Sequence, residues 1–147
     1  MEIVFLKAKK PLAKEISEQG TKPYPLTKNF TSEHFDISTD QKGLNKLYKL
    51  LTDQAASGAC LHKGYLKRPL KDEPRAFMSE RAKPTEMLVL DVDGLHTSNP
   101  GDLQALAEKI VLQLPEVFHN VSYIAQASAS LGFKKNTVSL HLFFLLD

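Results

Sequence analysis

The 147-residue sequence contains a single cysteine, Cys60. No disulfide can therefore form within the chain, and a zinc site built from several cysteines is excluded. The sequence also lacks an apolar run near the roughly 20 residues that a membrane-spanning helix needs. Its first apolar stretch precedes lysines, which is the reverse of the order in a secretory signal peptide. These absences favour a cytoplasmic protein with no membrane contact.

The charged residues are unevenly distributed along the chain. Residues 1–87 carry 16 Lys and Arg against 11 Asp and Glu, whereas residues 88–147 carry 3 against 6. A basic part beside an acidic part suits an enzyme that holds metal ions and a polyanion, but charge alone favours random scatter over the surface. With 42% hydrophobic residues, the length and composition predict a folded protein of single-domain size.

Local patterns in the first part of the chain predict one strand and one long helix. Residues Ile3–Lys7 read as a strand, and Pro11–Ser38 as irregular chain without periodicity. Apolar residues spaced by three and four predict an amphipathic helix over Asp40–Ser57, ended by Gly58. Residues Ala59–Pro84 contain several prolines and predict short strands and loops.

The second part predicts a strand, a helix and two further strands. The compact apolar segment Met87–Asp93 reads as a strand. A helix follows, with Asn99 as its cap, Pro100 in its first position and an apolar face that continues to Leu114. Residues Val121–Ala127 and Thr137–Leu146 predict an antiparallel hairpin. We expect an α+β fold, in which these strands form a mixed or antiparallel sheet and the helix covers one face.

The strand Met87–Asp93 carries two acids, Asp91 and Asp93. Side chains two positions apart on a strand point to the same face, roughly 6 to 7 Å apart, while Leu88, Leu90 and Val92 point the other way. Two carboxylates on a rigid apolar support can hold Mg²⁺ or Mn²⁺. The alternative is a strand end with two ordinary surface acids.

Residues Ser139 and His141 share one face of the last strand by the same alternation. A hydroxyl and an imidazole side by side can donate hydrogen bonds to a phosphate. A lone histidine on an apolar strand is, without context, more often a packed core residue. The loop before this strand adds possible phosphate donors, or it is a plain solvated turn; its polar residues are Ser128, Ser130, Lys134 and Lys135.

The order of these motifs resembles that of archaeo-eukaryotic primases and primase-polymerases of phages and mobile elements. Their first two catalytic motifs are an apolar-Asp-x-Asp strand and a Ser-x-His strand, matched here by Asp91-x-Asp93 and Ser139-x-His141 within Met87–Asp147. The resemblance implies an RRM-like core, Mg²⁺ or Mn²⁺ bound by Asp91 and Asp93, and a nucleoside triphosphate contacted by Ser139 and His141. It also implies a single-stranded DNA template and further domains, such as a helicase or a primase C-terminal region, in a longer protein.

A basic segment precedes the acid pair. Residues Leu61–Leu70 (LHKGYLKRPL) and Glu73–Ala76 (EPRA) look like sequence found at this place in primases of phages and other mobile elements. Cations interleaved with Tyr65 and Phe77 can contact phosphates while the rings stack on bases, or they form a basic surface of no special purpose. The candidate DNA-binding cations are Lys63, Lys67, Arg68, Arg75 and Arg81.

One feature departs from the primase pattern. The family places a third metal-binding carboxylate on a later strand, and the only acid that follows His141 is Asp147. We therefore expect residues 1–147 to be one catalytic domain or the N-terminal part of one, with a basic subregion over 1–86 and a motif-bearing subregion over 87–147.

Two other functional classes fit parts of the pattern. Residues Leu88–Gly94 also look like the apolar-Asp-x-Asp-Gly opening of haloacid-dehalogenase phosphatases, in which Asp91 would be the nucleophile and Asp93 the general acid. However, Leu95 stands where that family has threonine, and no later Asp-rich motif follows. The second alternative is a non-catalytic domain that binds nucleotide or DNA within a larger replication protein.

Overall fold

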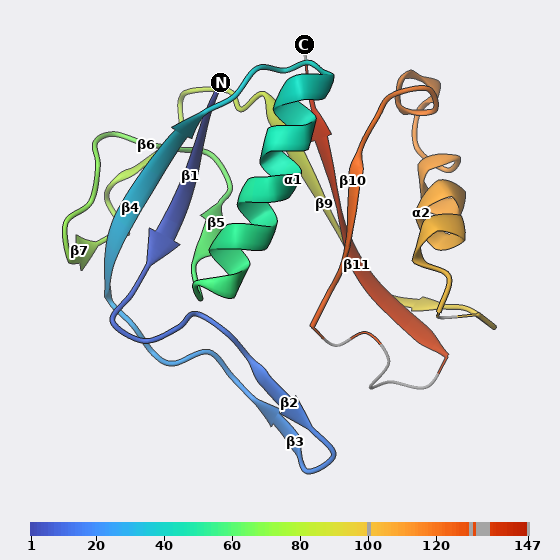
Figure 1. Ribbon diagram of the computed structural model, residues 1–147, viewed down its shortest axis with the longest axis horizontal. Helices are drawn as coiled ribbons and strands as arrows, with labels where there is room; N and C mark the ends of the chain where they lie inside the picture. The colour runs from blue at the N-terminus through green and yellow to red at the C-terminus, as the bar shows by residue number, and fades with distance from the viewer. Residues whose placement is uncertain (100, 130, 132–135, 147) are drawn as a thin grey trace. The chain divides into compact units, whose positions relative to one another are not determined.

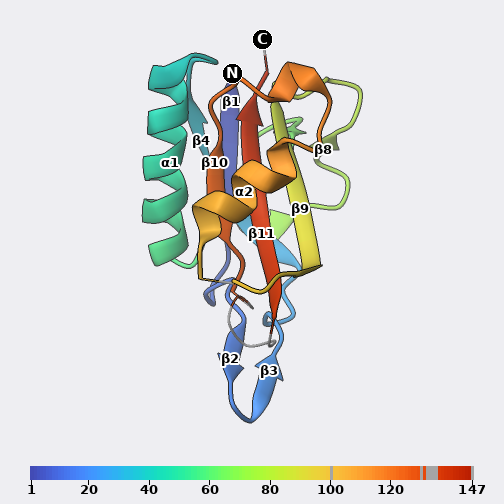
Figure 2. The same cartoon turned by 90° about the vertical axis from the view of Figure 1, so that its right-hand side faces the viewer.

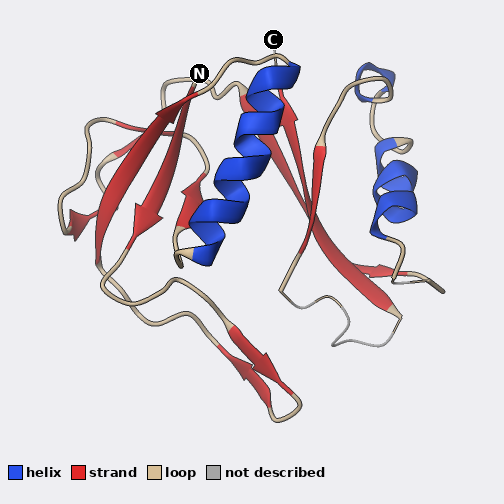
Figure 3. Ribbon diagram, in the orientation of Figure 1, coloured by secondary structure: helices blue, strands red, loops and turns tan. Residues whose placement is uncertain are grey.

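The computed structural model describes residues 1–99, 101–129, 131 and 136–146. These residues form an α+β fold with two α-helices and mainly antiparallel strands (Figures 1 and 3), which confirms the predicted class. No helix in this part of the chain is long and apolar enough to cross a membrane. The chain divides into two compact units, residues 1–87 and 88–146, and each is described separately below.

The first unit contains most of the short strands and the longer helix. Its elements are β1 (Glu2–Lys7), β2 (Glu15–Ser17), β3 (Gly20–Lys22), β4 (Asn29–Asp36), α1 (Gln41–Ala56), β5 (Cys60–His62), β6 (Tyr65–Leu66), β7 (Glu73–Pro74) and β8 (Ser79–Glu80). The main sheet has the order β5-β1-β4-β7, and β2 with β3 and β6 with β8 form separate pairs. Strand β1 is central, and its residues from Ile3 to Leu6 are all buried. On one sheet face, Val4 and Leu6 pack with Leu66 and Leu70.

Helix α1 forms where the sequence predicted it. The Asp40 carboxylate caps its start by accepting a hydrogen bond from the backbone N–H of Gly43 at 3.0 Å. The helix buries Leu44, Leu47 and Leu51 along one stripe, as the apolar spacing requires. Residue Gly58 follows with φ 73°, the left-handed conformation that commonly ends helices.

The prediction of irregular chain over Pro11–Ser38 is wrong. The segment contains the β2–β3 hairpin and the eight-residue strand β4, which pairs with β1 over Thr31–Asp36 and with β7 at Asn29 and Phe30. Periodicity did not reveal β4 because polar residues occur on both of its faces. The structure gives them partners: Glu33 accepts a hydrogen bond from Lys7 at 2.7 Å, and Ser32 and His34 form a chain with Glu2 at 2.7 and 2.9 Å.

The second unit is a three-stranded sheet covered by a helix. Its elements are β9 (Met87–His96, which starts at the unit boundary), α2 (Leu103–Val111), a 3₁₀ turn η1 (Glu116–Phe118), β10 (Ile124–Ala127) and β11 (Thr137–Leu145). The strand order is β10-β11-β9, and Figure 2 shows α2 across this sheet. Strands β10 and β11 are antiparallel, with Gln126 opposite His141. The predicted hairpin and the predicted helical cover are both confirmed.

The boundaries of α2 differ from the prediction. Asp102, not Asn99, caps the helix, since its carboxylate accepts a hydrogen bond from the N–H of Ala105 at 3.0 Å. Asn99 instead donates its backbone N–H to the Thr97 hydroxyl, and Pro100 lies outside the described residues. The backbone N–H of Leu112 still bonds four residues back, to Glu108, whereas those of Gln113 and Leu114 bond three residues back, so the regular helix ends at Val111. The apolar face nevertheless continues to Leu114.

Candidate nucleotide and metal site

The two acids of β9 project from the sheet face opposite the core. Leu88, Leu90 and Val92 pack against the core cluster beneath α2. Asp91 and Asp93 alternate with them and are exposed. The predicted placement of the two carboxylates on one strand face is therefore confirmed, and it follows from strict alternation on an extended strand.

One face of strand β11 is wholly apolar, whereas the other carries Ser139 and His141 together with the buried Phe143. Val138, Leu140, Leu142 and Phe144 are 0 to 1% exposed and form the centre of the core under α2. Between them, Ser139 and His141 are partly exposed on the other face. A lone histidine in an apolar strand could have packed in the core. His141 instead lies on the sheet face opposite α2.

The β9–β11 pairing brings both motifs together on one face of the sheet. Nε2 of His141 lies 3.2 Å from Oδ1 of Asp91. Three residues along β9, the backbone N–H of Gly94 donates a hydrogen bond to Oγ of Ser139 at 3.3 Å. These two contacts indicate that β9 and β11 are antiparallel, because Gly94 follows Asp91 on β9 whereas Ser139 precedes His141 on β11. The side chains of His141 and Asp91 are 31% and 53% exposed, so a ligand in solvent can reach both.

Comparison of the chain with protein-family models, curated proteins and solved structures finds no match.

Two further features of this face were not anticipated from the sequence. Gly94 adopts φ 66°, a conformation that costs a glycine little but strains other residues. This conformation occurs directly after Asp93, where the Gly94 N–H reaches Ser139. Gln126 lies directly opposite His141 in the hairpin register, and directly opposed side chains share a sheet face. Only the register, which the loop sequence does not specify, identifies Gln126 as a neighbour.

The donors on this face fit a hard cation that keeps part of its water shell. Asp91 and Asp93 supply carboxylate oxygens, which Mg²⁺ prefers, and Mg²⁺ is commonly held by one or two carboxylates together with water and substrate phosphates. Within the described residues, no group of three or more His, Cys, Asp or Glu gathers at a common point. Asp91 and Asp93 are therefore the carboxylates on this face that could contact such an ion.

The predicted phosphate loop lies largely beyond what the structure describes. Ser130, Lys134 and Lys135 are outside the described residues. Ser128 is described, and its backbone N–H donates a hydrogen bond to the carbonyl of Ser139 at 2.9 Å. Ser128 therefore continues the hairpin ladder next to the candidate site.

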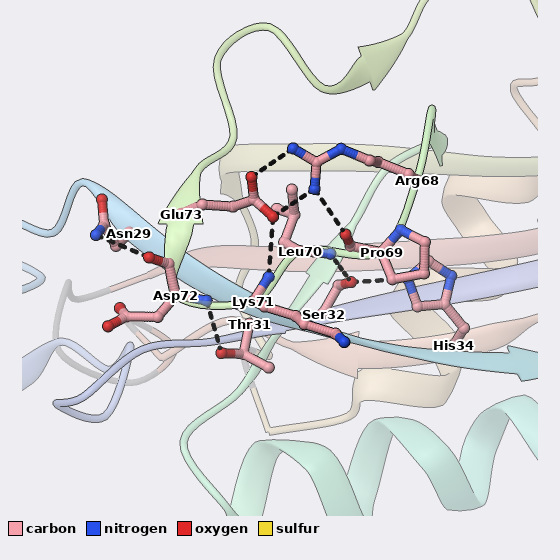
Figure 4. A network of polar contacts seen from close by, with 10 residues as sticks. All are labelled: Asn29, Thr31, Ser32, His34, Arg68, Pro69, Leu70, Lys71, Asp72 and Glu73. Atoms are coloured by element: carbon pink, nitrogen blue, oxygen red, sulfur yellow. Dashed lines mark hydrogen bonds and ion pairs between the residues drawn. The ribbon is translucent and has the colours of Figure 1, made fainter.

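The predicted DNA-binding cations lie in the first unit, where all five are exposed: Lys63, Lys67, Arg68, Arg75 and Arg81. Arg68 is engaged in a two-pronged contact with the carboxylate of Glu73, at 2.5 and 2.6 Å (Figure 4). The same contact lowers the pKa of Glu73. Arg75 lies over the ring of Phe30, with 5.8 Å between its guanidinium and the ring centre. These two arginines therefore already have protein partners.

The idea that Tyr65 stacks on a base is wrong. Its side chain is buried, with 3% exposure, and its hydroxyl donates a hydrogen bond to Glu86 at 3.1 Å. Burial and the Glu86 carboxylate raise the pKa of this phenol. The amino group of Lys83 covers the ring at 3.8 Å. Phe77, in contrast, is 82% exposed and is still available for stacking.

Proposed function

We propose that the second unit binds a nucleoside triphosphate with Mg²⁺ or Mn²⁺, as part of a nucleotidyltransferase of the primase or primase-polymerase type. The observation that carries the proposal is the 3.2 Å contact between His141 and Asp91. It places the Ser-x-His and Asp-x-Asp motifs on one exposed sheet face, where a single metal–phosphate ligand can contact both. If the two short motifs occurred in the sequence by chance, there would be no reason for their side chains to lie in contact in the fold.

Each side chain has a distinct role in this proposal. Asp91 and Asp93 hold the divalent ion through carboxylate oxygens. His141 and Ser139 donate hydrogen bonds to phosphate oxygens from the neighbouring strand. When bound, the metal neutralises charge on the triphosphate and aligns it for attack by a hydroxyl. The apolar side chains behind the four residues, buried on β11 and partly buried on β9, support both strands, so the donors are arranged before the ligand arrives.

We further propose that the second unit belongs to an RRM-like core and that the complete catalytic site synthesises primers. In-line attack on an α-phosphate requires two metal ions held in register, and two carboxylates on one strand provide few ligands for both. A third carboxylate would complete the site, and Asp147, the candidate in this sequence, lies outside the described residues. We therefore assign nucleotide and metal binding to residues 88–146 and primer synthesis to a site that includes a third acid.

A non-catalytic nucleotide-binding domain is the second candidate. The observation in its favour is that the described residues contain no cluster of three metal-binding side chains. Both candidates predict metal-dependent nucleotide binding at Asp91 and Asp93. Only the enzyme predicts incorporation of labelled nucleotides opposite a template.

Isothermal titration calorimetry with MnCl₂, followed by ATP or dATP in its presence, tests the shared prediction. The variant is Asp91→Asn with Asp93→Asn, which removes two charges while keeping side-chain size. Its matched control is Glu108→Gln with Glu116→Gln, two exposed acids in the same unit. We expect the first variant to lose manganese and nucleotide binding and the control to retain both. Equal affinities in all three proteins would overturn the metal assignment.

A further inference from the structure

Three lysines line one open pocket in the first unit, and none of them is among the cations predicted to bind DNA. The pocket has a volume of about 410 Å³, and we call it the lysine pocket. Its polar lining residues are Lys9, Lys10, Thr27, Lys28, Asn29 and Asp72. They come from the chain after β1, the chain before β4, the first residue of β4 and the chain before β7. Sequence inspection alone does not bring these segments together.

The charge of the lysine pocket is strongly unbalanced. Lys10 and Lys28 are exposed, and no ion pair involves either of them among the described residues. Lys9 lies 3.1 Å from the Asp72 carboxylate, but its side chain is 85% exposed, and such exposed pairs form and break at little cost. Three cations thus face one anion in a concave surface. Concave surfaces lined by one sign of charge attract ligands of the opposite sign.

One wall of the lysine pocket is held in place by hydrogen bonds. The side-chain amide of Asn29 donates to the backbone carbonyl of Asp72 at 2.9 Å, and the backbone N–H of Asp72 donates to the Thr31 hydroxyl at 3.3 Å (Figure 4). Asp72 adopts φ 53°, an uncommon conformation that these bonds help to maintain. A ligand would therefore meet a wall that is already formed.

The size and surroundings of the lysine pocket suit a polymer more than a single phosphate. A second pocket of about 260 Å³ shares Lys9 and Asp72 with it and adds Lys7. Lys7 is paired with Glu33 at 2.7 Å, so the second pocket lengthens the concave surface that a polymer could follow without adding an unpaired cation. Leu26, which also lines the lysine pocket, is 107% exposed. Tyr24, two residues earlier in the chain, is 51% exposed, and the amino group of Lys14 lies 5.2 Å from its ring centre. Exposed apolar and aromatic groups beside a cationic track are what unpaired bases stack upon.

We propose that the lysine pocket binds the phosphate backbone of single-stranded nucleic acid, with Tyr24 as a stacking partner for a base. The choice of nucleic acid over other polyanions rests on the proposed function, whereas the pocket and its charge do not. Lys10 and Lys28 contact phosphates directly, and Lys9 joins them when its exposed pair with Asp72 opens.

Fluorescence anisotropy with labelled dT₁₂ and rU₁₂, without metal, tests the proposal on the full chain. The test variant is Lys10→Ala with Lys28→Ala. The control is Lys42→Ala with Lys49→Ala, which removes the same charge from exposed positions of α1 that line neither pocket. Single-strand affinity changes with salt by a logarithmic slope of about 0.7 per phosphate contact, so each contact is worth about fivefold near 0.1 M salt. We expect roughly 25-fold weaker binding and a slope smaller by about 1.4 for the test variant, and little change for the control.

Several results would overturn the proposal. They are no oligonucleotide binding by the parent chain at low salt, equal losses in both variants, and mononucleotide binding without oligonucleotide binding. Photo-crosslinking of bromodeoxyuridine-labelled oligonucleotide to the peptide that contains Tyr24 is a second readout that needs no substitution, and crosslinks confined to other peptides would also count against it. Calorimetry with manganese and ATP is independent of these measurements, so failure of the lysine pocket and failure of the proposed function are distinguishable.

Discussion

Replacing His141 with alanine separates a ligand-binding role from a structural one. The side chain is 31% exposed, and its closest charged partner, Asp91, is 53% exposed at 3.2 Å. A polar contact this accessible contributes less than about 1 kcal/mol to folding. The imidazole is also absent from the core cluster under α2, so its removal leaves no cavity there. We expect His141→Ala to lower the free energy of unfolding by less than about 1 kcal/mol.

Nucleotide binding by the same variant should fall much further. Loss of one hydrogen bond from imidazole to a phosphate costs roughly 1 to 3 kcal/mol, equivalent to roughly 5- to 150-fold in affinity. Leu140→Ala in the same strand provides the contrasting case, because Leu140 is 0% exposed and its truncation should cost about 2 to 5 kcal/mol of stability.

The measurements are urea unfolding and calorimetry with ATP and manganese, performed on both variants and the parent chain. We expect His141→Ala, but not Leu140→Ala, to combine a large loss of ATP affinity with a small loss of stability. If His141→Ala instead unfolds as readily as Leu140→Ala, or binds ATP as tightly as the parent, the reasoning about His141 is refuted.

Three other predictions follow from the structure. Primer synthesis on a single-stranded template should be weak or absent with residues 1–147 and robust with a longer protein that supplies a further acidic strand; robust synthesis by this chain that disappears in Asp147→Ala would instead make Asp147 the third ligand. Burial lowers the pKa of His62 below its ordinary value of 6.5, so the unfolded state takes up a proton first, and stability should fall as pH drops through 6.5 towards the folded-state pKa. His62→Gln should reduce this loss when urea unfolding is compared at about pH 7.5 and about pH 5.5; an unchanged pH dependence would contradict the assignment. A Cβ at residue 43 would lie 1.7 Å from the Ser38 carbonyl oxygen, so Gly43→Ala should destabilise the chain by roughly 1 to 3 kcal/mol in thermal unfolding, whereas Lys49→Ala on the exposed side of α1 should not.

The parts of the fold that sequence reasoning predicts well are those in which one face is wholly apolar. The alternation along β11 and the acid pair on β9 determine which side chains point away from the core, so the placement of Asp91, Asp93, Ser139 and His141 could be predicted. The spacing of leucines predicted α1 for the same reason. In each case burial selects the pattern, and the pattern is visible without knowledge of the rest of the chain.

Features that depend on distant partners could not be predicted in this way. Strand β4 carries polar side chains on both faces, and only its pairing with β1 provides their partners, such as Glu2 for His34. Asn99 and Asp102 are both good caps, and the helix geometry selects Asp102. Gln126 was missed because the hairpin register is not evident from the loop sequence, and the lysine pocket was missed because its walls come from segments far apart in the chain.

The strict two-sidedness of β11 makes the gene sensitive to the size of a deletion. Removal of one codon within β11 would shift every later residue to the opposite side of the sheet. Residues such as Leu142 and Phe144 would then face the side that carries Asp91, and His141 or Phe143 would face α2. Removal of two codons preserves the alternation and shortens the strand. Among in-frame deletions, those of one codon in this strand should therefore be purged more strongly than those of two.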